Sequence, residues 1–487
     1  MRFPGTRPRR GEALAVLLAL LVALAPVAAQ TQDERDCDVR VTLLQVNDVY
    51  QFLPVERGRE GGLARVSTLR KEIARQSPHT MLLLSGDTIS PSVESITYRG
   101  RQMIDAWNQV GLDYSVFGNH EFDFGPEELL ARVGESKFKW LGANVIDKRT
   151  GRTFAETPPY VVREFDGVKV GIFGITLPET KTTSSPGPNV EFRAACETAN
   201  EIIPKLRDAG ARAVVALTHL SLAEDKELAR CAEGIDVIIG GHEHTLLQSA
   251  AGGVPIFKMT ADAREMGRID LNIDPKTGRV RSIDWEIIKV GADVKEDPEF
   301  AAVTRKYAAK IRELAGRVGR SSVALDARSA ENRTRETNVG NLVADSFRRA
   351  TGADIALLNG GSVRADTVIA PGLLTMRDVL SILPFNNELE VIEVTGALLL
   401  EALENGVGRT APGAEPGRFP QVSGMKYSFD ASLPAGQRIK SVTVGTRPLD
   451  PARSYTLATT RYIAVGGDGY DMLQAAARVP RGKLIDS

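Results

Sequence analysis

The sequence contains few cysteines, only three in a chain of 487 residues. A disulfide-built scaffold needs a far higher density, so a hydrophobic core must stabilise the fold. Cys196 and Cys231 fall on two expected helices of one domain. They either pair in an oxidising compartment or remain buried free thiols, and the sequence leaves both options open. Cys37 is expected to be unpaired.

An excess of charge of one sign is also missing, because 61 Lys and Arg side chains stand against 62 Asp and Glu side chains. Binding to a nucleic-acid polymer requires a basic excess or a basic stripe, so no such partner is expected. The composition, 43% hydrophobic and 25% charged, is that of a globular protein. A chain of this length exceeds a single core, and we expect two domains.

The sequence lacks a long apolar run except near its start, where Ala13–Ala25 follows four arginines and precedes the small residues Val27, Ala28 and Ala29. This pattern predicts a signal peptide over residues 1–29 and an exported protein, periplasmic or extracellular. A permanent anchor is the alternative, but the run is short for a bilayer. No later stretch is apolar enough, so no stable membrane span is expected after cleavage.

Residues 38–295 alternate short apolar runs with amphipathic segments, which predicts an α/β layered domain. The expected strands are Val41–Val46, Met81–Ser85, Tyr114–Phe117, Val168–Ile175, Ala213–Thr218 and Val237–Ile239. The expected helices are Arg65–Gln76, Gly100–Val110, Pro126–Val133, Cys196–Ala209 and Ala223–Cys231. In such folds, ligands bind in loops at the carboxyl ends of the strands.

A charged helix over Pro298–Val318, within residues 296–319, is expected to connect this domain to an α+β domain over residues 320–487. The second domain's expected helices are Glu336–Thr351, Thr375–Leu380 and Gly396–Asn405. Its expected strands are Ile355–Leu358, Ile439–Val444, Ser454–Thr460 and several around Val422–Phe429, with a long loop over Thr410–Pro420.

Polar residues cluster directly after the expected strands of the first domain. The groups are Asn47-Asp48, Gly86-Asp87, Gly118-Asn119-His120-Glu121, Thr218-His219 and Gly240-Gly241-His242-Glu243-His244. Four of the five histidines of the chain are among them. Aspartate, asparagine and histidine are ligands for Mn²⁺, Zn²⁺ or Fe²⁺, and neighbouring glycines let the backbone approach closely. Turn formation, helix capping and ordinary polar packing are the alternative explanations.

The order and setting of these five groups resemble the calcineurin-like metallophosphoesterases. Four later segments are similar to the C-terminal domain of the 5′-nucleotidase family: Asn338–Leu342, Asn359–Arg364, Leu383–Phe385 and Gly466–Tyr470. The resemblance implies a four-layer β-sandwich flanked by helices, with a smaller α+β substrate-binding domain. Each motif alone is weak, but their joint order is specific.

The resemblance implies two divalent metal ions, of Mn, Zn, Fe, Co or Mg, that share Asp87. One ion would also be held by Asp48 and His244, the other by Asn119, His219 and His242. His120 would stabilise the transition state or protonate the leaving oxygen, and Asp123 would orient its imidazole.

One position departs from the family pattern, because Tyr50 stands where a ligand histidine is usual. A phenol binds a divalent ion well only when ionised, near pKa ~10, so we expect a weaker or altered first metal site and retained hydrolysis.

The resemblance also implies six substrate-binding residues in the second domain. Phe385 and Tyr462 would sandwich a nucleobase, Asp468 would accept hydrogen bonds from ribose, and Arg333, Arg364 and Asn359 would contact phosphate or ribose oxygens. Core packing is the alternative for the two aromatics, and Arg335 can take the role of Arg333.

The expected function is hydrolysis of nucleoside 5′-monophosphates, with nucleotide sugars and cyclic nucleotides as further candidates. The alternatives are a hydrolase of sulfur-linked or other non-nucleotide esters and a nucleotide-binding protein that has lost catalysis through Tyr50. The small-molecule nucleotide is the expected partner, and the oligomeric state is left open.

Overall fold

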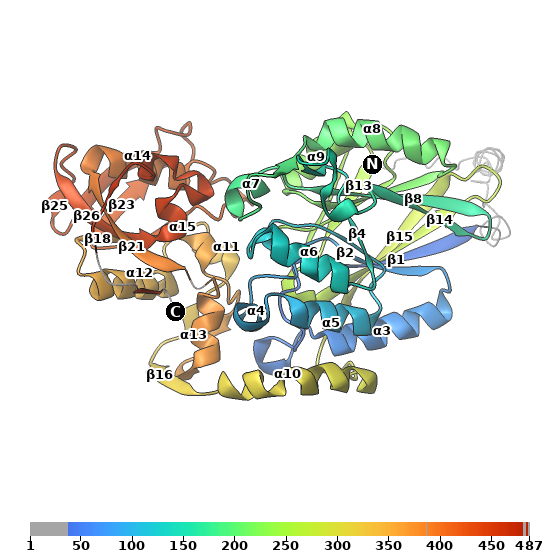
Figure 1. Cartoon of the computed structure of the whole chain (residues 1–487), viewed down its shortest axis with the longest axis horizontal. Helices are drawn as coiled ribbons and strands as arrows, with labels where there is room; N and C mark the ends of the chain where they lie inside the picture. Colours follow the sequence, from blue (N-terminus) through green and yellow to red (C-terminus); the bar gives the residue numbers. More distant parts are fainter. Residues whose placement is uncertain (1–37, 386, 481–483, 486–487) are drawn as a thin grey trace, which may run out of the picture.

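The computed structural model describes residues 38–385, 387–480 and 484–485. The expected signal peptide and Cys37 lie outside the described residues. Within the described part, no helix is long and apolar enough to cross a membrane. The chain forms two halves that lie side by side, and helix α10 (Ala301–Glu313) runs along one edge towards the second half (Figure 1).

The first half contains two large sheets. One has the order β15-β14-β1-β2-β3-β4, and the other has the order β12-β13-β11-β10-β8-β7. The strands of the first sheet are β1 (Val39–Val46), β2 (Thr80–Leu84), β3 (Tyr114–Val116), β4 (Lys139–Leu141), β14 (Glu265–Ile273) and β15 (Val280–Lys289). Those of the second are β7 (Tyr160–Phe165), β8 (Val168–Thr176), β10 (Ala213–His219), β11 (Val237–Gly240), β12 (Leu247–Ala251) and β13 (Val254–Lys258).

The sheets pack face to face because their strands are apolar on both sides. Leu43 of β1 and Ile172 of β8 belong to the core between the sheets. The outer face of the first sheet packs on α3 (Leu63–Gln76), α5 (Arg101–Val110), α6 (Pro126–Glu135) and α10. The outer face of the second sheet packs on α8 (Ala195–Asp208) and α9 (Leu222–Cys231). The predicted four-layer sandwich flanked by helices is therefore confirmed.

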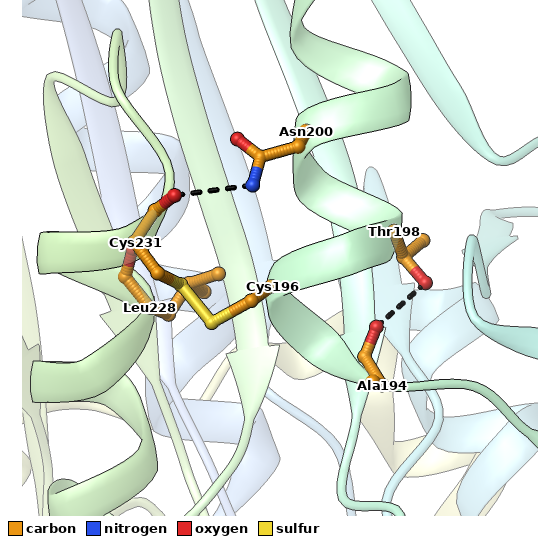
Figure 2. Close-up of a disulfide and its surroundings, with 6 residues drawn as sticks. All are labelled: Ala194, Cys196, Thr198, Asn200, Leu228 and Cys231. Atoms are coloured by element: carbon orange, nitrogen blue, oxygen red, sulfur yellow. Dashed lines mark hydrogen bonds between the residues drawn. A yellow bond between two sulfur atoms is a disulfide. The ribbon is translucent and has the colours of Figure 1, made fainter.

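A disulfide joins the two helices of the second outer layer. Cys196 of α8 and Cys231 of α9 are bonded, with their Cα atoms 5.8 Å apart (Figure 2). Asn200 also donates a hydrogen bond from Nδ2 to the carbonyl oxygen of Cys231, 3.1 Å away. The structure thus selects the paired option that the sequence left open.

The second half is built on a mixed sheet of order β22-β18-β26-β21-β27, with β28 also pairing with β21. Its strands are β18 (Ile355–Asn359), β21 (Glu388–Thr395), β22 (Pro420–Ser423), β26 (Ser454–Thr460), β27 (Ala477–Arg478) and β28 (Leu484–Ile485). Helix α12 (Asn338–Thr351) packs on one face and α14 (Gly396–Val407) on the other. This smaller α+β unit also agrees with the prediction.

The remaining elements are short. They are α4 (Val93–Tyr98), α7 (Thr180–Thr183), α11 (Ser329–Asn332), α13 (Met376–Ile382), α15 (Arg461–Ala464), β5 (Val145–Asp147), β6 (Arg152–Thr153), β9 (Val190–Phe192), β16 (Arg317–Ser321), β17 (Leu325–Asp326), β19 (Val368–Ile369), β20 (Gly372–Thr375), β23 (Met425–Phe429), β24 (Ile439–Val444) and β25 (Arg447–Pro448).

Two sequence predictions need correction. The connecting helix was expected to reach Val318, but α10 ends at Glu313 and Arg317–Ser321 is strand β16, which pairs with β20. Strands β4, β7, β12, β13, β14 and β15 of the two large sheets and β21 of the second half were also missed. Strand β15 is largely exposed and polar, so it lacks the continuous apolar run by which buried parallel strands are found.

Candidate active site

A cavity of about 820 Å³ lies between the two halves and receives residues from both. Its lining includes Asp87 and His120 from the first half and Arg364, Phe385 and Tyr462 from the second. The first-half residues come from loops at the carboxyl ends of β2 and β3, where such sheets bind ligands.

Asp48, Asp87 and His219 form a cluster of potential metal ligands in the first half. One ligand atom from each lies within 4.8 Å of the others, and all three residues are fully or almost fully buried. Two carboxylates and an imidazole are a suitable donor set for a divalent transition metal. The residues present therefore fit a cation at this position.

Electrostatics within the cluster favour charged carboxylates. Burial alone would raise the pKa of Asp87, but His219 and His120 hold this pKa well below its usual range. Burial opposes a charge on His219, yet Asp87 and Asp48 raise the pKa of its imidazole to about 10. A positively charged histidine thus stabilises the ionised carboxylates, and a bound cation would take over that role.

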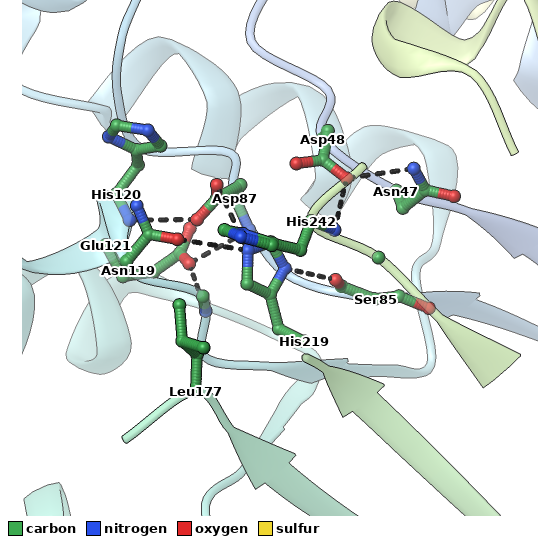
Figure 3. A network of polar contacts seen from close by, with 12 residues as sticks. Asn47, Asp48, Ser85, Asp87, Asn119, His120, Glu121, Leu177, His219 and His242 are labelled. Carbon is green, nitrogen blue, oxygen red and sulfur yellow. Dashed lines mark hydrogen bonds and ion pairs between the residues drawn. The ribbon is translucent and has the colours of Figure 1, made fainter. Parts of the chain in front are cut away.

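Two of the other predicted metal-binding residues, Asn119 and His242, lie beside this cluster (Figure 3), and His244 lies close to Asp48. Asn119 Oδ1 lies 3.3 Å from His219 Nε2. The rings of His242 and His219 have centroids 5.2 Å apart, and the His242 backbone N–H donates to Asp48 Oδ2 at 2.9 Å. His244 Nε2 lies 3.6 Å from Asp48 Oδ1. The structure therefore brings all six residues together.

The loops that carry these residues are tightly bent. Asp48, Asp87 and His242 have φ values of 53°, 59° and 81°, in the left-handed region. Such conformations cost on the order of 1–3 kcal/mol each and concentrate at functional sites. A Cβ on Gly118 would overlap Asp87 Oδ1, so only glycine fits there.

Glu121 holds two of these loops together, a role that sequence reasoning missed. Its carboxylate accepts hydrogen bonds from the backbone N–H groups of Asp87, Thr88, Ile89 and Gly118. Burial and the neighbouring charge of Asp87 raise the pKa of Glu121 to about 7. Its place between His120 and Phe122 in a polar motif was the available signal, but only the fold reveals its partners.

Lys258 was missed entirely, because a single lysine at the end of a strand carries no sequence signal. It is fully buried, and its Nζ donates to the carbonyl oxygens of Leu220 at 2.6 Å and Gly241 at 2.8 Å. The same ammonium pairs with Asp225 at 2.8 Å and Glu243 at 2.5 Å. Lys258 therefore ties together the loops that follow β10 and β11 and carry the site histidines.

His120 and Asp123 form the predicted pair. His120 Nδ1 lies 2.7 Å from Asp123 Oδ2, and Ser184 Oγ donates to the other Asp123 oxygen at 2.8 Å. The backbone N–H of His120 donates to Asp87 Oδ1 at 2.8 Å. With Nδ1 engaged, Nε2 is the ring nitrogen that remains for a ligand in the cavity.

Tyr50 lies inside the cluster. Its hydroxyl oxygen is 3.2 Å from Asp48 Oδ1, 3.3 Å from Asp87 Oδ2 and 3.0 Å from His244 Nε2. Burial raises the pKa of the phenol well above its usual value, so the side chain is neutral.

The second half contributes two arginines with unpaired donors. Within the described residues, Arg364 Nε and Nη2 and Arg333 Nε are buried and have no hydrogen-bond acceptor. The Arg364 guanidinium lies 5.0 Å from the centroid of the Tyr50 ring and 5.9 Å from that of Phe385. Buried guanidinium donors without protein acceptors are well suited to an anionic ligand.

Asp468 is a further polar group in the second-half lining. Its carboxylate accepts hydrogen bonds from Asn359 Nδ2 at 2.7 Å and from the Tyr462 hydroxyl at 3.1 Å. Phe385 stacks near His120, with ring centroids 5.8 Å apart. All six predicted substrate-binding residues therefore line one cavity, together with the predicted metal-binding residues Asp87, Asn119, His242 and His244.

The halves are joined around the cavity by polar contacts. Arg377 pairs with Glu94 at 2.7 Å, and Arg409 forms a double ion pair with Glu179. Asp366 Oδ2 lies 3.6 Å from His244 Nδ1, so a carboxylate of the second half reaches a histidine of the first.

The sandwich, the buried carboxylate–histidine cluster and the facing arginines define the class of metal-dependent phosphoesterases. Residues 41–246 match the calcineurin-like phosphoesterase family model, and residues 317–475 match the 5′-nucleotidase C-terminal domain model. The chain belongs to the 5′-nucleotidase family, whose members are metal-dependent phosphoric ester hydrolases.

Similar proteins support this assignment. The crystal structure of a 5′-nucleotidase precursor from Thermus thermophilus superposes with a TM-score of 0.86 at 32% identity, covering 92% of this chain and 94% of that one. Snake venom 5′-nucleotidase of Naja atra is 28% identical over 89% of this chain and 92% of its own length. The trifunctional nucleotide phosphoesterase YfkN of Bacillus subtilis is 32% identical over 90% of this chain, which spans 32% of that protein's length.

Proposed function

We propose that this protein hydrolyses nucleoside 5′-monophosphates to a nucleoside and phosphate. The observation that carries the proposal is the Arg364 guanidinium, whose buried Nε and Nη2 find no acceptor among the described residues while facing a cluster built around Asp87. A phosphoryl group is the ligand that satisfies both sides, because its oxygens accept from guanidinium and coordinate divalent cations.

Two divalent ions that share Asp87 are proposed, of Mn, Zn, Fe, Co or Mg. Asp48 and His244 would complete one position, and Asn119, His219 and His242 the other. Bound cations polarise phosphoryl oxygens and make water a stronger nucleophile. The tight grouping of Asp48, Asp87 and His219 supports at least one such position.

His120 is the proposed acid or transition-state stabiliser. Asp123 holds its Nδ1, which leaves Nε2 as the ring nitrogen that would deliver a proton to the ester oxygen that departs. Ser184 in turn fixes Asp123.

The second-half residues are the proposed substrate-binding set. Arg333, Arg364 and Asn359 would contact phosphate or ribose, Asp468 would accept from ribose, and Phe385 and Tyr462 would flank the base. Stacking is worth on the order of 1–3 kcal/mol and tolerates different bases. Nucleotide sugars and cyclic nucleotides are further candidate substrates, in keeping with the word trifunctional in the name of the Bacillus relative.

We propose the division 1–29 signal peptide, 38–295 catalytic domain, 296–319 connecting segment and 320–487 substrate-binding domain. Export to the periplasm or the exterior is supported by the Cys196–Cys231 disulfide, since such bonds persist in oxidising compartments. The similarity to a snake venom protein also favours export.

Phosphate release from AMP by the purified protein, measured with each of the five metals, tests the proposal. We expect release that chelation abolishes. Release from sulfur-linked esters but not from AMP would instead identify a hydrolase of non-nucleotide esters. Tight AMP binding without any release would identify a binding protein.

A further inference from the structure

The Tyr50 hydroxyl lies at the point where three predicted ligands of the first cation converge. Its distances to Asp48 Oδ1, Asp87 Oδ2 and His244 Nε2 are 3.2, 3.3 and 3.0 Å. These are hydrogen-bond distances, and the phenolic proton can be shared with the carboxylates.

A cation cannot share this point with the hydroxyl. Divalent ions lie about 2.0–2.2 Å from oxygen and nitrogen ligands, so an ion held by Asp48, Asp87 and His244 must sit between them. The phenolic oxygen already fills that space. To bind a cation there, the three ligand atoms would have to move closer to the point that the hydroxyl occupies.

The Tyr50 side chain is held in place on several sides. It is 5% exposed, with the Arg364 guanidinium over its ring at 5.0 Å and the His244 ring centroid at 5.5 Å. The backbone N–H of Tyr50 donates to Asp262 Oδ1 at 3.0 Å. The hydroxyl cannot leave without a rearrangement of this packing.

The His219 side of the cluster is different. Asp48, Asp87 and His219 still offer one ligand atom each within 4.8 Å of one another. Asn119 and His242 lie beside His219, and Figure 3 shows all three close to Asp87.

We infer that the Tyr50 hydroxyl occupies the position of the first cation, so that the resting protein retains a single divalent ion on the His219 side. This inference rests on the proposed function for the presence of cations. A second ion enters only when the phenol turns out of the cluster, and the two positions therefore differ in affinity.

The test is metal stoichiometry in the absence of nucleotide. The full chain is stripped with a chelator and titrated with Mn²⁺, and bound ions are counted by calorimetry and elemental analysis. Wild type should retain one equivalent. Tyr50→His removes the phenolic oxygen and offers an imidazole nitrogen, and it should bind a second equivalent at least about tenfold more tightly than wild type does.

Two further variants separate obstruction from other effects. Tyr50→Phe deletes only the hydroxyl, and its second-ion affinity should fall between those of wild type and Tyr50→His. Tyr160→His places a new histidine on strand β7, away from the cavity, and should retain the wild-type count.

Two equal equivalents in wild type would overturn the inference, as would loss of an ion in Tyr50→Phe, which would make the phenol a ligand. Failure of Tyr50→His to tighten the second ion would also overturn it. AMP hydrolysis is measured on the same samples. One bound ion without phosphate release would reject the proposed function and leave this inference standing.

Discussion

The two walls of the cavity differ in how their polar groups are satisfied. On the wall from the first half, Asp87 pairs with His219, and both His219 and Asp48 bond to nearby backbone groups. On the wall from the second half, Arg333 and Arg364 keep buried donors without acceptors within the described residues. One wall is thus suited to cations and the other to an anion, and a phosphoryl group between them would complete both.

The supports of the walls differ as well. The first rests on two buried ionisable side chains, Lys258 and Glu121, which donate or accept several short hydrogen bonds. The second rests on contacts among Asp468, Asn359 and Tyr462. Substitutions in the first wall should therefore reduce turnover and metal binding, whereas substitutions in the second wall should weaken substrate binding.

The largest expected effect is that of His120→Ala. Removal of a general acid lowers kcat by roughly 10²–10⁴-fold, and because His120 is not a proposed ligand, bound metal should not change. Steady-state kinetics with AMP and elemental analysis measure both quantities. His79→Ala, at the histidine outside the site, is the control. Loss of metal from His120→Ala would show that the first wall has been assigned wrongly.

Lys258→Met should follow in size. It leaves Asp225 and Glu243 buried without their cation, which costs about 3–5 kcal/mol of unfolding free energy. The loops bearing His219 and His242 also lose the hydrogen bonds that Lys258 donates to both of them, so Mn²⁺ affinity should fall as well. Urea unfolding and calorimetry test this, with exposed Lys276→Met expected to stay within about 0.5 kcal/mol of wild type. Equal stability of the two variants would contradict the proposed support of the first wall.

Arg364→Met tests the second wall. Each lost hydrogen bond to a charged group costs about 1.5–3 kcal/mol, so inhibition by inorganic phosphate should weaken by at least about tenfold. The exposed Arg349→Met is the matched control and should leave phosphate affinity unchanged. If phosphate binds Arg364→Met as tightly as wild type, the unpaired guanidinium has another partner.

Phe385→Ala should have the smallest effect and should act only on nucleotides. Loss of one stacking surface costs about 1–3 kcal/mol and should appear as a higher KM for AMP. Hydrolysis of glycerol phosphate, which has no base, provides the control on the same variant. An equal loss for both esters would mean that Phe385 supports the fold and His120 rather than the base.

Sequence reasoning located the buried strands well, because β1, β8 and β10 are short segments rich in apolar and β-branched residues, a pattern that does not depend on neighbours. It failed for strand β15, which is mostly exposed and gains its order from pairing with β14. The end of α10 was also misplaced, since β16 is defined only by its distant partner β20.

The sequence by itself determined the identity of the polar groups at the strand ends, including His120 with Asp123 and the unusual Tyr50. These signals are local, as each lies within a few residues of a recognisable strand. Only the tertiary structure decided that Lys258 and Glu121 support the site, that Cys196 and Cys231 pair, and that the Tyr50 hydroxyl lies among Asp48, Asp87 and His244. Each of these facts depends on distances between segments far apart in the chain, which packing alone fixes.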